Sequence, residues 1–248
     1  MDTAAYIIIF TVGLLFGSFT NVIIARMPVG ESIVFPPSHC PHCHERLRAV
    51  DLVPVFSYLF LRGHCRYCQQ TISIRYPLVE VLCALLFVIV YLRWGLTMTT
   101  VSGCVFAVIL LGAAFIDIDH GIIPDRLTYP GIIIGLILSF GTLGFLPALY
   151  GTLAFGGLMF AIAVISKGGM GGGDVKLAAV IGAFTGVTGS AVTLLMASLL
   201  GAIFGLGVMA VKKTGRKTPI KFGPFLAVSA YIAFLFADTI VSWYLGLL

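Results

Sequence analysis

The first apolar run of the chain, residues 6–24, carries no charged side chain and is long enough to cross a lipid bilayer. A spanning α-helix needs about 20 predominantly apolar residues to cross the hydrocarbon layer. Asp2 precedes this run and Arg26 follows it, which reverses the charge order of a cleavable signal peptide. We therefore predict a retained first membrane helix.

Further apolar runs fill most of the sequence. Charged residues make up 10% of the 248 residues, whereas an ordinary soluble domain has about 25%. A globule of this size cannot bury so much apolar surface, so the sequence predicts an all-α polytopic membrane protein. Pro147 and Gly189 mark two of the predicted hairpins. About eight transmembrane helices are expected, at residues 4–25, 77–94, 98–118, 128–146, 148–166, 175–188, 190–211 and 223–247.

The basic residues predict the orientation of these helices. If the N-terminus lies outside and the helices alternate, 14 of the 15 Lys and Arg residues fall in inside loops, and only Arg93 falls outside. This positive-inside bias predicts an N-out, C-out topology. The chain then divides into a first transmembrane helix (1–26), a polar cytosolic insert (27–76) and a transmembrane core (77–248).

The polar insert contains two Cys-x-x-Cys pairs, Cys40 with Cys43 and Cys65 with Cys68. Two such pairs at this separation are typical of a tetrahedral zinc site with four thiolate ligands. A closed site leaves no position for substrate, so we predict structural zinc that folds a loop too small to build its own core. Disulfides or a redox dithiol are alternatives, but stable disulfides are rare in the cytosol. Four nearby histidines either replace a thiolate or remain exposed: His39, His42, His44 and His64.

Two aspartates are predicted to lie at similar depth near the inner membrane face. Asp117 falls in the last turn of one span, and Asp174 begins a later span that rises from the same face. Carboxylates at membrane depth are costly and indicate functional sites. Asp119 lies about 200° around the helix from Asp117, so only one of the two can face Asp174. We select Asp117 because it adjoins an uninterrupted apolar run, and we interpret Asp125 as a helix-capping or solvated interfacial residue.

Paired carboxylates have a specific chemistry. When two carboxyl groups face each other at close range they share one proton, and the pair can act as base on water and as acid on a peptide bond. Asp117 and Asp174 are therefore candidate catalytic residues. Five glycines within residues 168–173 permit close backbone approach, and the segment is not a P-loop because it lacks the Gly-Lys-Ser/Thr ending. We predict a substrate-contacting loop formed by Gly171, Gly172, Gly173 and Lys176.

Seven segments of the sequence stand out together: residues 17–22, 40–43, 65–68, 75–80, 117–125, 171–176 and 222–225. In combination they resemble the bacterial type IV prepilin peptidases, which belong to the GxGD class of aspartyl proteases. The resemblance covers nearly the whole chain, and the order and spacing of its segments are specific. It implies that Asp117 and Asp174 cleave a basic leader from prepilin or pseudopilin substrates.

The same resemblance implies a second activity, N-methylation of the newly exposed terminal residue with S-adenosylmethionine as methyl donor. The polar insert is associated with this activity in the family, and Arg75 and Glu80 are candidate residues for it. The resemblance also implies the bacterial inner membrane as the location, with the zinc insert and the aspartates on the cytosolic side. The bilayer and pilin-like substrates are the expected partners, and no nucleic acid is expected.

Two other functions stay open at this level. A proton-coupled membrane transporter would also place aspartates and glycine-broken helices in the membrane. It predicts inverted repeats, which the sequence does not show, and it leaves the cysteine insert unexplained. A non-catalytic, zinc-dependent assembly factor is the second alternative. The sequence indicates neither the oligomeric state nor whether the substrates serve type IV pili, type II secretion or DNA uptake.

Overall fold

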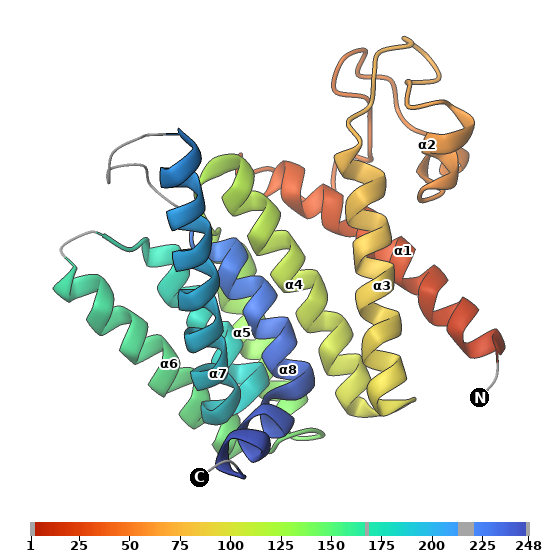
Figure 1. Cartoon of the computed structure of the whole chain (residues 1–248). Helices are drawn as coiled ribbons and strands as arrows, with labels where there is room; N and C mark the ends of the chain where they lie inside the picture. The colour runs from red at the N-terminus through yellow and green to blue at the C-terminus, as the bar shows by residue number, and fades with distance from the viewer. Residues whose placement is uncertain (1–2, 167–168, 213–220, 247–248) are drawn as a thin grey trace. The chain divides into compact units, whose positions relative to one another are not determined.

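The structure is a computed structural model that describes residues 3–166, 169–212 and 221–246. These residues form helices joined by loops, together with two isolated β-bridges in the insert, and the all-α prediction is confirmed (Figure 1). The elements are α1 (Thr3–Arg26), η1 (Ala49–Leu52), α2 (Phe56–Phe60), α3 (Arg75–Trp94), α4 (Met98–His120), α5 (Asp125–Ser139), α6 (Phe145–Ile165), α7 (Gly172–Lys212) and α8 (Gly223–Leu245).

Six of these helices are long and apolar enough to cross a membrane: α1, α3, α4, α6, α7 and α8. Helix α5 has 15 residues and is shorter than a full span. Pro147 lies inside the first turn of α6 and not in the preceding hairpin, because the chain turns at Gly144, whose φ is 96°. The prediction that Pro147 marks a hairpin is therefore wrong by a few residues.

Helix α7 is broken at Gly186, which has φ 65° and ψ −168°. A positive φ is accessible to glycine at little cost, and Figure 1 shows the chain reversing direction here. Gly189, the predicted break, lies instead within the helix. When α5 and the two segments of α7 are counted separately, the described residues contain the eight apolar helical segments that the sequence predicted.

The chain forms two compact units, residues 1–112 and 113–248. In the first unit, α1 and α3 run antiparallel with their backbones in close contact. A Cβ added to Gly13 or Gly17 would lie 2.5 Å from the Cα of Ala84 or Glu80, respectively. Small residues allow such close approach between membrane helices. The predicted three-part division of the chain stays a prediction.

In the second unit, α6 packs antiparallel against the first segment of α7. A Cβ on Gly182 would lie 2.2 Å from the carbonyl oxygen of Gly151. The second segment of α7 returns toward the start of α8, where the rings of Phe204 and Phe225 are 5.4 Å apart between centroids. The reversal at Gly186 therefore brings the start of α7 and the start of α8 to the same end of this unit.

Candidate functional site

Asp117 lies in the last turn of α4 and is buried, with 7% of its surface exposed. Its Oδ2 accepts a hydrogen bond of 3.1 Å from the backbone N–H of Gly223, the first residue of α8. The first N–H groups of a helix have no partner within the helix, and the helix dipole favours a negative group at that end. The start of α8 is thus built to hold the Asp117 carboxylate in one orientation.

A second contact ties the same two segments together. The Nζ of Lys221 donates a hydrogen bond of 2.5 Å to the carbonyl oxygen of Ile118. The chain leaves α4 at Gly121, whose φ is 69° and whose N–H donates to the carbonyl oxygen of Asp117. Cationic groups near a helix C-terminus are favourable, so Lys221 stabilises the end of α4.

Asp174 lies in the first turn of α7 and is half-buried. Its backbone N–H donates to the carbonyl oxygen of Gly171 at 3.1 Å, and its carboxyl group is close enough to Asp117 for a direct electrostatic interaction. The loop that follows α4 packs against the same turn, because a Cβ on Gly173 would lie 2.9 Å from the Cβ of Ile123. The second unit therefore brings Asp117 and Asp174 into one neighbourhood.

The other predicted residues of this region differ in their surroundings. Asp119 is exposed, whereas Asp117 on the other side of α4 is buried. Asp125 lies in the first turn of α5, and its carboxylate pairs with the Nζ of Lys176 at 2.5 Å. Lys176 also lies 5.4 Å from the ring centroid of Tyr129. A Cβ on Gly172 would have nothing within 4 Å, so this glycine leaves open space beside the start of α7.

Sequence reasoning missed the roles of Gly223 and Lys221. The signal for Gly223 was present in Phe222-Gly223-Pro224, since proline in a first turn marks a helix start. That this start would face a residue 106 positions earlier could not be derived from local sequence.

The four predicted zinc cysteines form a cluster in the first unit. The sulfur atoms of Cys40, Cys43, Cys65 and Cys68 all lie within 4.8 Å of one another, and all six cysteines of the chain are free of disulfides. Four thiol sulfurs from two tight turns match the donor set of a closed tetrahedral site. The histidines of the insert do not belong to this cluster. These residues can hold a metal ion, and zinc is the metal that the donor set suits.

The two cysteine turns share one local geometry, which shows an internal repeat that was not expected from the sequence. In each turn the residue after the second cysteine has a positive φ, 57° at His44 and 59° at Gln69. The N–H of each of these residues donates to the carbonyl of the first cysteine, Cys40 or Cys65. A histidine precedes each turn and contacts a backbone carbonyl two residues earlier. The His-Cys-x-x-Cys pattern was the available signal.

The Cys40 and Cys43 thiols have different affinities for protons. Burial raises the pKa of Cys40, but hydrogen bonds from the amides of Cys43 and His42 and from neighbouring thiols lower it to about 6. The Glu45 amide lowers the pKa of Cys43, but burial and the adjacent Cys40 and Cys68 sulfurs raise it to about 11. Near neutral pH, Cys40 is therefore readily available as a thiolate, whereas Cys43 holds its proton. A bound cation would favour deprotonation of Cys43 as well.

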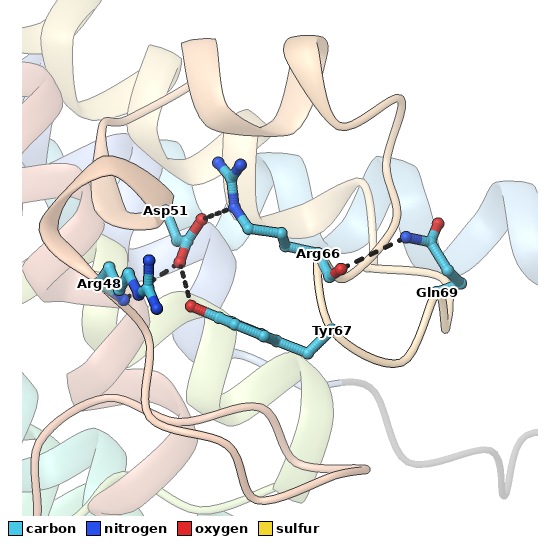
Figure 2. Close-up of polar contacts among 5 residues, drawn as sticks. All are labelled: Arg48, Asp51, Arg66, Tyr67 and Gln69. Carbon is cyan, nitrogen blue, oxygen red and sulfur yellow. Dashed lines mark hydrogen bonds and ion pairs between the residues drawn. The ribbon is translucent and has the colours of Figure 1, made fainter.

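Asp51 connects the second cysteine turn to η1 (Figure 2). Its Oδ1 accepts from the Nε of Arg66 at 2.6 Å, and its Oδ2 accepts from the Tyr67 hydroxyl at 3.1 Å. The backbone N–H of Arg48 donates to Oδ2 as well. Burial raises the pKa of Asp51, but these hydrogen bonds together lower it below its usual value. Arg66 and Tyr67 lie between Cys65 and Cys68, so Asp51 positions the turn that carries two of the four clustered cysteines.

The two residues proposed for methyl transfer lie at the start of α3, in the first unit. The guanidinium of Arg75 lies 5.5 Å from the ring centroid of Tyr76. Glu80 is buried, with 7% of its surface exposed, and its Oε2 accepts a hydrogen bond of 2.7 Å from the N–H of Val55.

The fold and these residues define a multi-pass membrane protein with an insert whose four cysteines can hold a metal ion and with a pair of neighbouring aspartates at helix ends. Residues 11–94 match the bacterial peptidase A24 N-terminal domain, and residues 104–206 match the type IV leader peptidase family. The chain therefore belongs to the type IV leader peptidase family and is a multi-pass enzyme of the bacterial inner membrane. The family resemblance of the sequence is confirmed.

Curated relatives match over nearly the whole chain. A prepilin leader peptidase/N-methyltransferase from Aeromonas hydrophila is 37% identical, covering 96% of this chain and 93% of the relative. Proteins with the same name from Bacillus subtilis (strain 168) and Neisseria gonorrhoeae are 34% and 38% identical, with 96% and 94% of this chain covered and 97% and 92% of the relatives. No solved structure matches the chain.

Proposed function

We propose that this protein cleaves the basic leader from type IV prepilin or pseudopilin substrates and then methylates the new N-terminal residue. The relatives named above carry both activities in their name, and they align with both units of this chain. The observation that carries the peptidase assignment is the buried carboxylate of Asp117, held by the N–H of Gly223 and in electrostatic range of Asp174.

Asp117 and Asp174 form the catalytic pair in this proposal. One carboxylate takes a proton from water, which attacks the scissile carbonyl carbon, while the protonated partner donates to the departing amine. The Gly223 N–H keeps Asp117 from rotating away from its partner. The glycines at 171–173 lie next to Asp174, and of the three it is Gly172 that leaves open space for an extended substrate strand. Lys176 lies one turn beyond Gly172 along α7.

The cleaved bond lies at the cytosolic boundary of the membrane. The positive-inside bias of the sequence favours an N-out, C-out topology. In that topology the end of α4, the start of α7 and the cysteine insert all face the cytosol. A pilin-like substrate with one apolar helix and a basic leader would place its cleavage site at the same depth.

Methyl transfer is assigned to the first unit, which contains Arg75, Glu80 and the cysteine insert. Zinc at Cys40, Cys43, Cys65 and Cys68 is structural, because a four-sulfur shell leaves no open position. S-adenosylmethionine supplies the methyl group when it is bound. The insert orders the segment that lies against Glu80, so metal binding and methyl transfer are linked through its fold.

The test is cleavage of a purified prepilin by the protein in nanodiscs, with Asp117→Asn and Asp174→Asn variants. Each replacement keeps the side-chain size and removes the exchangeable acid, and we expect leader cleavage to fall by at least about 1,000-fold, in keeping with loss of acid and base catalysis. Asp238→Asn is the matched control, because Asp238 is exposed and lies about 22 Å along α8 from Gly223.

Mass spectrometry of the same reactions reports leader loss and methyl gain as separate mass changes. Full cleavage by both aspartate variants would contradict the catalytic assignment. A wild-type protein that neither cleaves nor methylates prepilins would instead favour the non-catalytic assembly factor. Proton-dependent uptake by proteoliposomes without cleavage would favour the transporter.

A further inference from the structure

Glu80 is a buried carboxylate on the seam between α1 and α3, where helices approach closely. The Cα of Gly17 lies directly against it, since a Cβ on Gly17 would be 2.5 Å from the Cα of Glu80. Its known donors are the N–H of Val55 and the hydroxyl of Ser18. A carboxylate has about four acceptor positions, so this one has capacity for further donors.

Asn21 lies one turn along the same seam and is also buried, with 3% of its surface exposed. Its Nδ2 donates to the carbonyl oxygen of Tyr76 at 3.0 Å, which fixes the orientation of the amide. Its Oδ1 is buried and has no hydrogen-bond partner. A buried acceptor without a donor is costly and rare in folded proteins. The seam therefore presents a buried carboxylate and an unsatisfied amide oxygen within one helical turn.

The segment that covers Glu80 is held in an unusual conformation. Val55 has φ 63° and ψ −50°, and the N–H of Phe56 donates to the carbonyl of Pro54 at 2.6 Å, which closes a γ-turn. This form of the γ-turn is rare and strained, particularly for a β-branched residue. Such strain persists only where the surroundings hold it and is concentrated at functional sites. Here the hydrogen bond to Glu80 holds it.

The same segment lines an open surface hollow of about 260 Å³, which is walled mainly by apolar residues and also by Ser57 and Arg66. Val53, Phe56 and Phe60 supply apolar parts of its wall. Buried carboxylate and amide oxygens require hydrogen-bond donors. A primary ammonium offers three N–H groups, and its positive charge balances the negative charge of the carboxylate. The apolar part of the hollow suits an apolar side chain, and Val55, whose N–H contacts Glu80, lies in the chain between the lining residues Val53 and Phe56. A peptide N-terminus with an apolar first residue combines both features.

We propose that Glu80 and Asn21 bind the primary amine of the methyl acceptor, with the ammonium replacing the Val55 N–H at Glu80. This inference rests on the proposed methyl-transfer function and assigns its acceptor site. The ammonium gives one proton to the Glu80 carboxylate, and the nitrogen lone pair forms a C–N bond to the methyl carbon of the sulfonium donor. The S–C bond breaks as its electron pair returns to sulfur, which leaves a neutral thioether and a secondary ammonium.

The experiment compares Glu80→Gln with Glu80→Ala in nanodiscs. Glutamine keeps the size of the side chain and an oxygen that accepts from Val55, whereas alanine removes both. The acceptor is a synthetic peptide with the sequence of a cleaved pilin N-terminus, and methyl gain is measured by mass spectrometry. We expect both variants to lose at least about 100-fold in methyl transfer, the scale of a lost proton acceptor. If Glu80 only anchors Val55, Glu80→Gln will methylate like wild type, which overturns the proposal.

A binding measurement reports the ammonium itself. Wild-type protein should bind the free-amine peptide at least about tenfold more tightly than its N-acetylated form, the scale of a charge-assisted hydrogen bond. Glu80→Gln should abolish that preference, whereas a purely structural role would leave it unchanged. Glu31→Gln is the control, because Glu31 is exposed in the same insert. Leader cleavage is measured on the same samples. If the wild-type protein neither cleaves nor methylates, the proposed function is refuted. If the wild-type protein does both and Glu80→Gln methylates equally well, only the amine site is refuted.

Discussion

The backbone N–H of Gly223 at the start of α8 donates a hydrogen bond to the carboxylate of Asp117 at the end of α4. The two residues are 106 positions apart, and the contact is buried within the second unit. The absence of a side chain at Gly223 is what allows it, because a Cβ there would lie 2.7 Å from the Oδ2 of Asp117. Glycine at this position therefore sets where the carboxylate lies.

Gly223→Ala should impair cleavage with little loss of stability. The added Cβ would also lie 3.1 Å from the Cγ and 3.2 Å from the Cβ of Asp117, so the whole side chain must shift. Because no backbone atom is among these contacts, we expect the folded yield to fall less than it does for a clash with a helix backbone. Misplacing a catalytic group by about 1 Å can cost about 100-fold in rate, so we expect cleavage to fall by roughly that factor. Methyl transfer to an already cleaved peptide should persist. The control is Gly207→Ala, where an added Cβ meets nothing within 4 Å. Equal cleavage by the two variants would argue against the role of Gly223.

Gly182→Ala should destabilise the second unit itself. Its added Cβ would lie 2.2 Å from a backbone oxygen of Gly151, and backbone atoms of a packed helix cannot move aside as a side chain can. We expect a lower midpoint for detergent-induced or thermal unfolding and a reduced folded yield. Gly157→Ala in α6 is the matched control, since its Cβ has open space and alanine favours a helix by up to about 1 kcal/mol over glycine. Equal unfolding midpoints for Gly182→Ala and Gly157→Ala would show that α6 and α7 can move apart enough to accept the added Cβ.

Metal removal should affect methyl transfer more than cleavage. The cysteine cluster belongs to the first unit and both aspartates belong to the second. A small metal-bound segment loses its fold with its ion, so a strong chelator or Cys65→Ser should abolish methyl transfer. We expect about one zinc per wild-type chain by elemental mass spectrometry, as a four-ligand shell requires. Cys104→Ser should retain the metal, because Cys104 lies outside the cluster. Full methyl transfer by metal-free protein would contradict a structural role for the ion.

Asp51→Asn should weaken the insert at neutral pH. The substitution breaks the ion pair with Arg66 and weakens the remaining hydrogen bonds. We expect the insert to lose about 1 kcal/mol in stability. The measurement is the rate of zinc transfer to a competing chelator, which should be faster for the variant. The pKa of Asp51 is lowered on folding, so its contribution is complete above the unfolded value of about 4 and declines as the pH falls through the folded value. The difference in stability of the insert between Asp51→Asn and the wild type should therefore be the same at pH 6 and pH 8. Glu45→Gln, an exposed change of the same kind, should have no effect.

Much of this protein could be predicted from local sequence. The apolar runs predicted the helices because the length and composition of a spanning segment are local properties. The two Cys-x-x-Cys pairs predicted a four-sulfur cluster because each pair forms its own turn, and only one long-range approach then has to occur. The positions of Asp117 and Asp174 at the ends of predicted helices also led us to expect similar depth for both, and this stays a prediction.

Other features were decided by the tertiary structure alone. Gly186 and not Gly189 breaks α7, although both are glycines in the same apolar run, because packing against α6 selects which one adopts a positive φ. The group that donates a hydrogen bond to Asp117 is a backbone N–H. Every residue except proline has such a group, so the sequence does not indicate which one will contact a distant side chain. The strained Val55 is held by Glu80 across 25 residues. Local composition determines which segments become helices, whereas contacts between distant segments depend on how the backbones pack, and only the folded chain contains that information.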